Sequence, residues 1–148
     1  MRVICIHPLR RENANNPRGS IIKGLQEDCW YFLYDGYTIT DGEIVYQKTP
    51  VPENLYRLNR YARLETANAV AIDICAIVGE NGAGKSSLVD IFIRVVNNLA
   101  AYVIGEKFAF PKAEHLHFIA DVFAEVYIEI NQSIFCIQSY KDAISVKE

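Results

Sequence analysis

The sequence predicts an α/β fold with an antiparallel β-meander before a glycine-rich loop and a β-hairpin after the helix that follows this loop. A glycine-rich run at residues 79–86 stands between an apolar run and a stripe of apolar residues at helical spacing. Two Asp-Gly pairs separate β-prone runs between residues 29 and 46, which is typical of tight hairpin turns. Apolar and polar residues alternate at 122–130, and a second β-prone run follows at 134–140, which predicts the hairpin.

Length and composition indicate one domain and exclude some classes of partner. The chain has 148 residues, about the size of one ordinary domain. Its 15 basic and 18 acidic residues leave a formal net charge of −3, so the whole chain has no general attraction for nucleic acid or an anionic membrane. No apolar run approaches the ~20 residues that a membrane span needs, so we expect no membrane segment and a cytoplasmic protein. The four cysteines are expected to be buried thiols without disulfides: Cys5, Cys29, Cys75 and Cys136.

The part before the loop is predicted to be rich in β-strands. Residues 3–6 form a first short strand, which His7 and Pro8 end because proline cannot donate to a ladder. The β-meander follows, with strands at residues 29–34, 37–40 and 43–46. The near-continuous apolar run at residues 69–78 predicts a central strand, covered on both faces, that leads into the loop.

One helix and one hairpin are expected after the loop. The helix has a core stripe, with Asn97 and Asn98 among the polar residues between its members: Leu88, Ile91, Phe92, Val95, Val96 and Leu99. It ends at Gly105. Glu125 and Glu129 fall on the polar face of the first hairpin strand and are expected to be solvated. Residues 131–133 form the turn, residues 134–140 the second strand, and residues 141–148 a charged tail.

The strongest chemical signal is the run at residues 79–86, the phosphate loop, which satisfies the pattern G-x-x-x-x-G-K-[ST] without a gap. Glycine lacks a Cβ, so the backbone can take positive φ and approach phosphate oxygens closely. Successive N–H groups then form an anion nest, and the helix that follows adds the partial positive charge of its N-terminus. The residues expected to bind the phosphates are Glu80, Asn81, Gly82, Ala83, Gly84, Lys85, Ser86 and Ser87.

Three side chains of this run have distinct expected roles. Lys85, the expected catalytic residue, supplies a mobile positive charge for the β- and γ-phosphates. Ser86 is the expected metal ligand, because its hydroxyl stands where it can bind Mg²⁺, a hard cation that takes few protein ligands. Ser87 adds a hydroxyl or an N–H near the α-phosphate. The pattern therefore predicts a binding site for a nucleoside triphosphate with Mg²⁺.

Hydrolysis usually needs a second acidic element, an apolar strand that ends in Asp or Asp-Glu, which holds the metal and positions water. Residues 69–73 have this form, but Asp73 precedes the loop on the same predicted strand. Residues 116–121 follow the loop, and Asp121 is interpreted as an acidic turn residue before the next strand. Neither aspartate is assigned the role.

The run Ile77-Val78-Gly79-Glu80-Asn81-Gly82-Ala83-Gly84-Lys85-Ser86-Ser87-Leu88 resembles the Walker A segment of ABC-type ATPases. The layout of a β-rich part, Walker A, its helix and a later hairpin is similar to the N-terminal lobe of the SMC, RecF and double-strand-break-repair branch of these P-loop NTPases, in the AAA ATPase group. The family's Walker B strand, its switch histidine and its signature motif beginning Leu-Ser-Gly-Gly have no counterpart in this sequence. Gln132 and Gln138 lie in or beside the predicted hairpin and are not assigned the role of the family's Q-loop glutamine.

The resemblance implies that residues 1–148 form a single N-terminal nucleotide-binding lobe of a longer ATPase, so that the chain is a fragment of an ATP hydrolase. It implies ATP and Mg²⁺ as cofactors, with Walker B and signature elements supplied by the remainder of the ATPase or by a second ATPase subunit. DNA or a partner protein is the further partner that it implies. Two alternatives stay open: a self-contained P-loop phosphotransferase that uses Asp121 for the metal, and a non-catalytic module that senses nucleotide.

Overall fold

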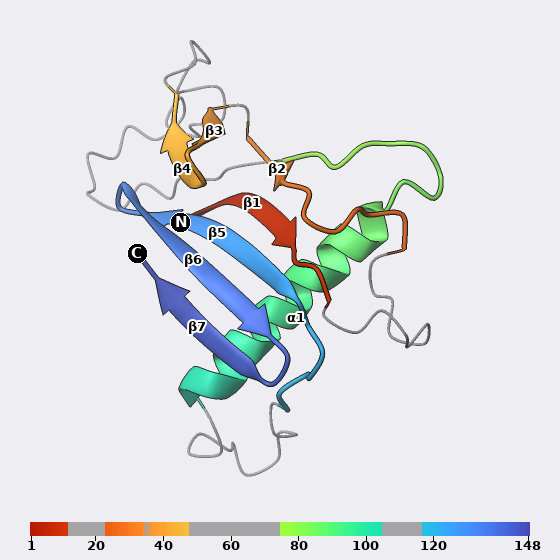
Figure 1. Cartoon of the computed structure of the whole chain (residues 1–148), viewed down its shortest axis with the longest axis vertical. Coiled ribbons are helices and arrows are strands. Elements are labelled where there is room, and N and C mark those ends of the chain that lie inside the picture. The colour runs from red at the N-terminus through yellow and green to blue at the C-terminus, as the bar shows by residue number, and fades with distance from the viewer. Residues whose placement is uncertain (12–22, 35, 48–74, 105–116) are drawn as a thin grey trace, which may run out of the picture. The chain divides into compact units, whose positions relative to one another are not determined.

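A five-stranded antiparallel sheet forms the larger of two units, which combines Met1–Leu33 with Ile77–Glu148 (Figure 1). The computed structural model describes residues 1–11, 23–34, 36–47, 75–104 and 117–148. The strand order is β2-β1-β5-β6-β7, with β1 at Arg2–Pro8, β2 at Tyr31–Phe32, β5 at Ala124–Ile130, β6 at Ser133–Tyr140 and β7 at Ala143–Lys147. The smaller unit, Tyr34–Ala76, contains the two-stranded sheet of β3, Tyr37–Thr40, and β4, Glu43–Tyr46.

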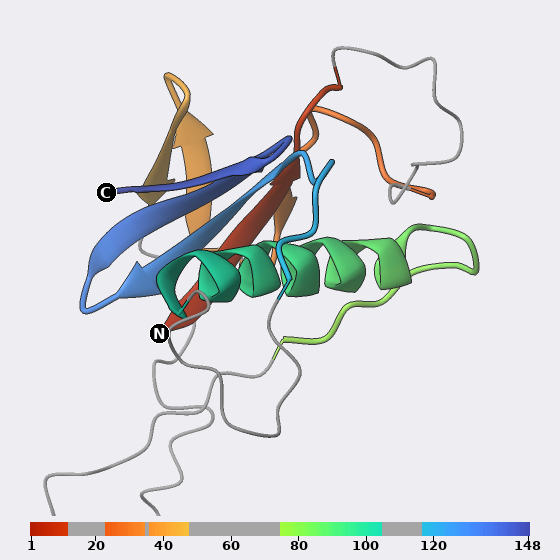
Figure 2. The same ribbon diagram turned by 90° about the horizontal axis from the view of Figure 1, so that it is seen from below.

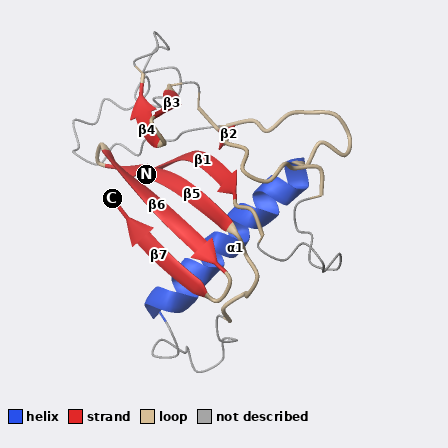
Figure 3. Ribbon diagram, viewed as in Figure 1, coloured by secondary structure: helices blue, strands red, loops and turns tan. Residues whose placement is uncertain are grey.

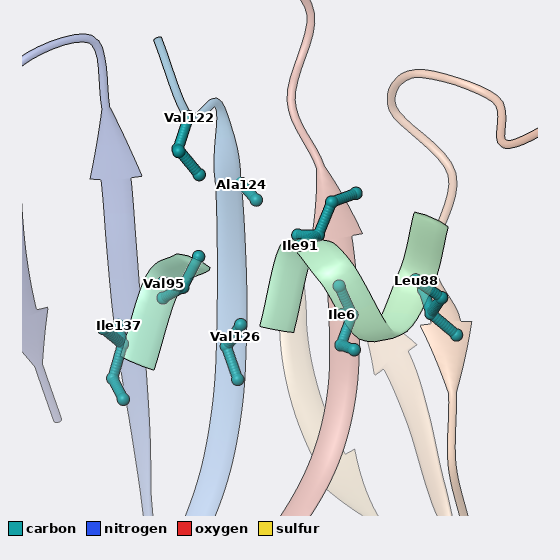
Figure 4. Packing of buried hydrophobic residues seen from close by; sticks show 8 residues of the cluster. All are labelled: Ile6, Leu88, Ile91, Val95, Val122, Ala124, Val126 and Ile137. Atoms are coloured by element: carbon teal, nitrogen blue, oxygen red, sulfur yellow. The ribbon is translucent and has the colours of Figure 1, made fainter. Parts of the chain in front are cut away.

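Helix α1, Lys85–Ile104, lies along one face of the five-stranded sheet (Figure 2). Apolar side chains of α1 interlock with alternate residues of β1, β5 and β6 to form the core (Figure 4). Burial of such side chains is the main favourable term in folding. The buried cluster consists of Ile6, Leu88, Ile91, Val95, Val122, Ala124, Val126 and Ile137.

The elements with the clearest local patterns are confirmed (Figure 3). The helix begins within the phosphate loop motif, at Lys85, and β1 includes the strand predicted at residues 3–6. The turn between β5 and β6 places Asn131 and Gln132 at φ values of 52° and 71°. These positive angles are what a tight two-residue hairpin turn requires. The turn at Asp41-Gly42 between β3 and β4 has the same character, with φ values of 53° and 84°.

The predicted β-meander is wrong in its first strand. Tyr31 pairs with Ile6 and Phe32 pairs with Cys5, so β2 adds to the edge of the large sheet beside β1. Only the strands at residues 37–40 and 43–46 pair with each other as predicted. Strands that follow each other in the sequence do not have to be neighbours in a sheet. The pairing of β2 with β1 joins residues about 25 positions apart, and no local pattern in the sequence indicates it.

Two further segments differ from their predictions. The expected charged tail contains β7, which pairs with β6 from Ala143 to Lys147 and extends the sheet. Residues 75–78, the described part of the strand expected to enter the phosphate loop, have no regular secondary structure and are exposed. Residues 69–74, including Asp73, lie outside the described residues.

The helix stripe is correct at most positions and wrong at two. Val96 is 40% exposed, whereas Asn98 is completely buried. The amide of Asn98 donates to the Ile119 carbonyl at 2.8 Å and to Ser139 Oγ at 3.1 Å, and its oxygen accepts from Ile119 N at 2.7 Å. A buried amide is stable here because its polar atoms find partners on two other segments. Asn98 therefore ties α1 to β6 and to the chain before β5.

The cysteine prediction is correct for Cys5 and wrong for the others in degree of burial. Cys5 is buried in β1, Cys29 and Cys136 are half-buried, and Cys75 is exposed. Burial raises the pKa of the Cys5 thiol to about 12, which keeps it protonated and unreactive at neutral pH.

Candidate functional site

The green segment of Figure 1 that leads into α1 contains the phosphate loop, which has turn and bend geometry at residues 81–84. Ala83 N donates to the Glu80 carbonyl at 3.2 Å, and Leu88 N donates to the Gly84 carbonyl at 2.9 Å, which begins the helical hydrogen bonding. Gly82 and Gly84 have φ values of 87° and 88°, a region that residues with a Cβ rarely adopt. The loop conformation therefore depends on glycine at these two positions, as the sequence pattern predicts.

Lys85 folds its side chain back over the beginning of the phosphate loop. Its ammonium donates to the carbonyl oxygens of Gly79 at 2.6 Å and Glu80 at 2.7 Å. An ammonium in this position brings its positive charge to the loop while its hydrogen bonds are satisfied by two carbonyl groups.

The N-terminus of α1 adds to the attraction for an anion. The first turn of the helix contains no acidic side chain, and Ser86 is exposed there. The first N–H groups of a helix have no partner within the helix, and the aligned peptide dipoles give this end a partial positive charge. Ser86 is thus exposed at the end of the helix that carries the partial positive charge.

The loop residues that the pattern assigns to phosphate binding fall into two sets. Gly79, Glu80, Asn81, Gly82 and Ala83 are exposed, and Gly82 has no neighbour within 4 Å in the direction of a Cβ. Gly84 is buried, and Ser87 is half-buried with its hydroxyl donating to the Lys23 carbonyl at 2.8 Å. To donate to an α-phosphate as predicted, the Ser87 hydroxyl would have to give up this hydrogen bond to the Lys23 carbonyl.

Residues 23–25, the strap, pack directly on the phosphate loop, and the sequence analysis missed them. Gly24 approaches the backbone of Gly82 and Gly84, and Leu25 covers Gly84. The strap lies about 60 positions before the loop in the sequence and matches no motif. A single Lys-Gly pair carries no signal in the sequence that could have placed it here.

Asp121 does not approach the geometry of a metal ligand on a strand end. It is exposed, has a φ of 60°, and its N–H donates to the Lys141 carbonyl at 3.0 Å. The interpretation as a turn residue is confirmed. Among the residues that the structure describes, no group of three or more His, Cys, Asp or Glu side chains is placed to hold a metal ion.

A second polar cluster lies on the strands β1, β5 and β6. Glu125 accepts from His7 Nδ1 at 3.0 Å, from the Tyr127 hydroxyl at 3.0 Å and from the Gln138 amide at 2.8 Å. The hydrogen bond from His7 is the main cause that lowers the pKa of Glu125, and burial opposes it. The His7 ring stacks on Trp30 with 4.0 Å between ring centroids.

This cluster corrects the expectation that Glu125 is solvated, since its side chain is only 15% exposed. Burial raises the pKa of Tyr127 and of Cys136 beside it, so both stay protonated. Every polar atom of the Glu125 carboxylate has a protein partner, which is the pattern of a network that joins strands. Glu129, further along β5, pairs with Arg2 at 3.6 Å.

Helix α1 is the one helix in the described part of the chain that is long and apolar enough to span a membrane by length and composition. The core helix of a soluble protein passes the same test, and α1 packs Leu88, Ile91 and Val95 against the sheet. The expectation of no membrane segment stays a prediction.

Comparisons with protein-family models, with curated proteins and with solved structures give no match. The resemblance of the phosphate loop to Walker A, and the family that it implies, therefore stay predictions that depend on the residues of this chain.

Proposed function

We propose that this chain binds ATP with Mg²⁺ through the phosphate loop, as the N-terminal nucleotide-binding lobe of an ABC- or SMC-like ATPase. The observation that carries the proposal is the arrangement at the start of α1. The Lys85 ammonium lies 2.6 Å and 2.7 Å from two loop carbonyls, next to two glycines with positive φ and the N-terminus of a helix. A positive side chain, a glycine-rich backbone that can approach an anion closely and the N-terminus of a helix are together favourable for binding a polyphosphate.

The residues present fit a metal–polyphosphate group. The space beside Gly82 is open, so an anion can approach the loop backbone there. No acidic side chain in the first turn of α1 repels it. Ser86 offers an exposed hydroxyl at the second position of the helix, and a hydroxyl oxygen is a suitable ligand for Mg²⁺.

Binding and hydrolysis make different demands on the chain. Lys85 and the loop backbone bind and orient the phosphates, whereas cleavage needs a group that positions water. Bound ATP supplies the phosphoanhydride bond, and Asp121, exposed on a turn, gives no support to a self-contained phosphotransferase. We therefore propose that hydrolysis requires the remainder of the ATPase or a second ATPase subunit, and that DNA or a partner protein responds to it.

The exposed face of α1 supports an additional layer of protein. The side of the helix away from the core cluster carries a row of large apolar side chains with exposed fractions of 40% or more: Val89, Ile93, Val96 and Val103. Contiguous apolar surface of this kind usually marks an interaction site. The remainder of an ATPase domain is the partner that the proposed function assigns to it.

Replacement of Lys85 by alanine tests the proposal. Charge-assisted hydrogen bonds contribute about 1.5–3 kcal/mol each, so Lys85→Ala is expected to weaken ATP binding by about 10- to 100-fold. Titration calorimetry in the presence of Mg²⁺ measures the affinity. Lys147→Ala, which removes the same charge from an exposed position on β7, is the matched control and should bind ATP like the parent chain.

The proposal fails if Lys85→Ala and Lys147→Ala bind ATP with the same affinity as the unaltered chain. A thermal melt of each variant accompanies the titration, so that loss of folding is not mistaken for loss of the phosphate contact.

A further inference from the structure

The strap and the phosphate loop meet through two glycines that face each other. A Cβ added to Gly24 would collide with the Gly82 carbonyl oxygen and lie 2.7 Å from Gly84 N. A Cβ added to Gly84 would lie 2.6 Å from Leu25 Cδ2 and 2.9 Å from the Gly24 carbonyl carbon. Real Cβ contacts are longer than this, so the approach requires glycine on both sides.

A hydrogen bond fixes the strap to α1 at the same place. Ser87 Oγ, in the first turn of the helix, donates to the Lys23 carbonyl at 2.8 Å. This bond joins residues 64 positions apart in the sequence. The hydroxyl hydrogen of Ser87 is therefore used in the bond to the strap and is not free to donate to a ligand.

The phosphate loop needs an external support because of its own composition. Its glycines, Gly79, Gly82 and Gly84, give the backbone many accessible conformations, and ordering such a loop on ligand binding costs conformational entropy. A segment that already holds the loop in one conformation reduces that cost and so increases affinity. The strap touches the loop at Gly82, Ala83 and Gly84, next to the helix N-terminus.

We propose that residues 23–25 are a built-in support of the nucleotide site, in which Gly24 and Ser87 are positioning residues that hold residues 82–84 in the conformation that binds phosphate. The inference depends on the proposed function for its ligand. Gly24 acts by the absence of a side chain, and Ser87 acts through the Lys23 carbonyl. The strap itself makes no contact with the phosphates in this role.

A matched pair of glycine substitutions tests the proposal. Gly24 and Gly42 have nearly equal φ values of 80° and 84°, so alanine brings similar backbone strain at each. Only Gly24 has neighbours, because nothing lies within 4 Å of a Cβ at Gly42. We expect Gly24→Ala to weaken ATP binding by about tenfold or more, since hydrogen bonds from displaced N–H groups weaken steeply with distance and angle. Gly42→Ala should leave the affinity within about twofold of the parent value.

A double-mutant cycle separates support from direct contact. Ser87→Ala breaks the bond to the strap without adding atoms, and Ser87→Thr keeps the hydroxyl and should restore affinity. If both residues act through the strap, the effects of Gly24→Ala and Ser87→Ala on ATP affinity combine to much less than their product. Fully multiplicative effects would overturn the positioning role of Ser87.

The outcomes distinguish this inference from the function on which it rests. If the unaltered chain does not bind ATP, the proposed function is wrong. If it binds ATP and Gly24→Ala binds equally well, the function stands and the strap is overturned as a support. Should Gly24→Ala fail to fold in a thermal melt, Ser87→Ala decides alone. Unchanged ATP affinity contradicts the proposal. Weakened affinity supports it if the ligand-free Ser87→Ala chain also exchanges the amide hydrogens of residues 82–84 faster than the parent, because loss of a direct phosphate contact would leave that exchange unchanged.

Discussion

Lys85 combines two duties at the boundary between loop and helix. Its backbone begins α1, and its ammonium binds the carbonyl groups of Gly79 and Glu80. One residue thereby couples the position of a positive charge to the direction of the helix axis. The features that define the site are the positive φ angles of Gly82 and Gly84 and the side chain of Lys85.

Glu125 makes a prediction about the pH dependence of stability. Its pKa in the folded chain lies below the ordinary value of 4.5, mainly because of the hydrogen bond from His7. A carboxyl group with a lowered folded-state pKa stabilises the fold fully above the unfolded-state pKa, and this contribution is lost as the pH falls through the folded-state value.

Glu125→Gln is therefore expected to reduce the free energy of unfolding at pH 7 by about 1.5–3 kcal/mol, the range for hydrogen bonds to a charged group. The difference between variant and parent should shrink as the pH falls below about 4.5. Urea unfolding at pH 7 and at about pH 3.5 measures both values. An equal difference at the two pH values would contradict a stabilising, ionised Glu125.

Individual residues also show where sequence reasoning stops. The motif predicted the glycines and Lys85 as site residues because each position of the pattern G-x-x-x-x-G-K-[ST] has a known role toward phosphate. The periodicity places Asn98 outside the core stripe of the helix and Glu125 on a solvated strand face, because polar residues on a periodic element are usually exposed. Both are buried or half-buried because partners from distant segments, Ile119 and Ser139 for Asn98 and His7 for Glu125, satisfy their polar atoms.

On the scale of elements, helix α1 has two apolar faces with different surroundings. Ile91 is 3% exposed and belongs to the core cluster, whereas Ile93 on the same helix is 57% exposed. Two isoleucines of the same helix thus lie in different environments, one in the core and one at the surface.

Ile91→Ala is expected to lower the free energy of unfolding by about 2–5 kcal/mol, because it leaves a cavity between α1 and the sheet. Ile93→Ala, the matched variant, should change it by less than about 0.5 kcal/mol. Denaturant unfolding of the two variants measures the difference. Equal losses would mean that the outer face of α1 is already packed against protein in this chain.

Elements with strong local patterns were predictable, and those defined by distant pairing were not. The helix and the β5–β6 hairpin follow from periodicity and turn chemistry within about 20 residues of sequence. The pairing of β2 with β1 and of β7 with β6 adds strands to the edges of a sheet, and short, mixed strands such as Ala143–Lys147 have little periodicity of their own.

On the scale of the whole molecule, the larger unit is formed by two separate parts of the sequence, and the smaller unit lies between them in the chain. The phosphate loop, the strap and α1 belong to the unit of Met1–Leu33 and Ile77–Glu148, so the site is assembled from segments far apart in the chain. Residues 12–22 and 48–74 lie outside the described residues. The helix after the phosphate loop and the β5–β6 hairpin were predictable from local patterns, whereas the contact between the strap and the loop required the structure.

The central claim is that this chain recognises phosphate groups, and comparison of ATP with adenosine tests it most directly. Both ligands carry the same base and sugar, but only ATP presents a charged triphosphate to Lys85 and the start of α1. Titration calorimetry of the 148-residue chain with each ligand, in the presence of Mg²⁺, measures the two affinities. The account predicts binding of ATP and at least about 100-fold weaker binding of adenosine, because at least about 3 kcal/mol of contact to the phosphates is lost. Equal affinity for the two ligands, or no binding of ATP, would contradict it.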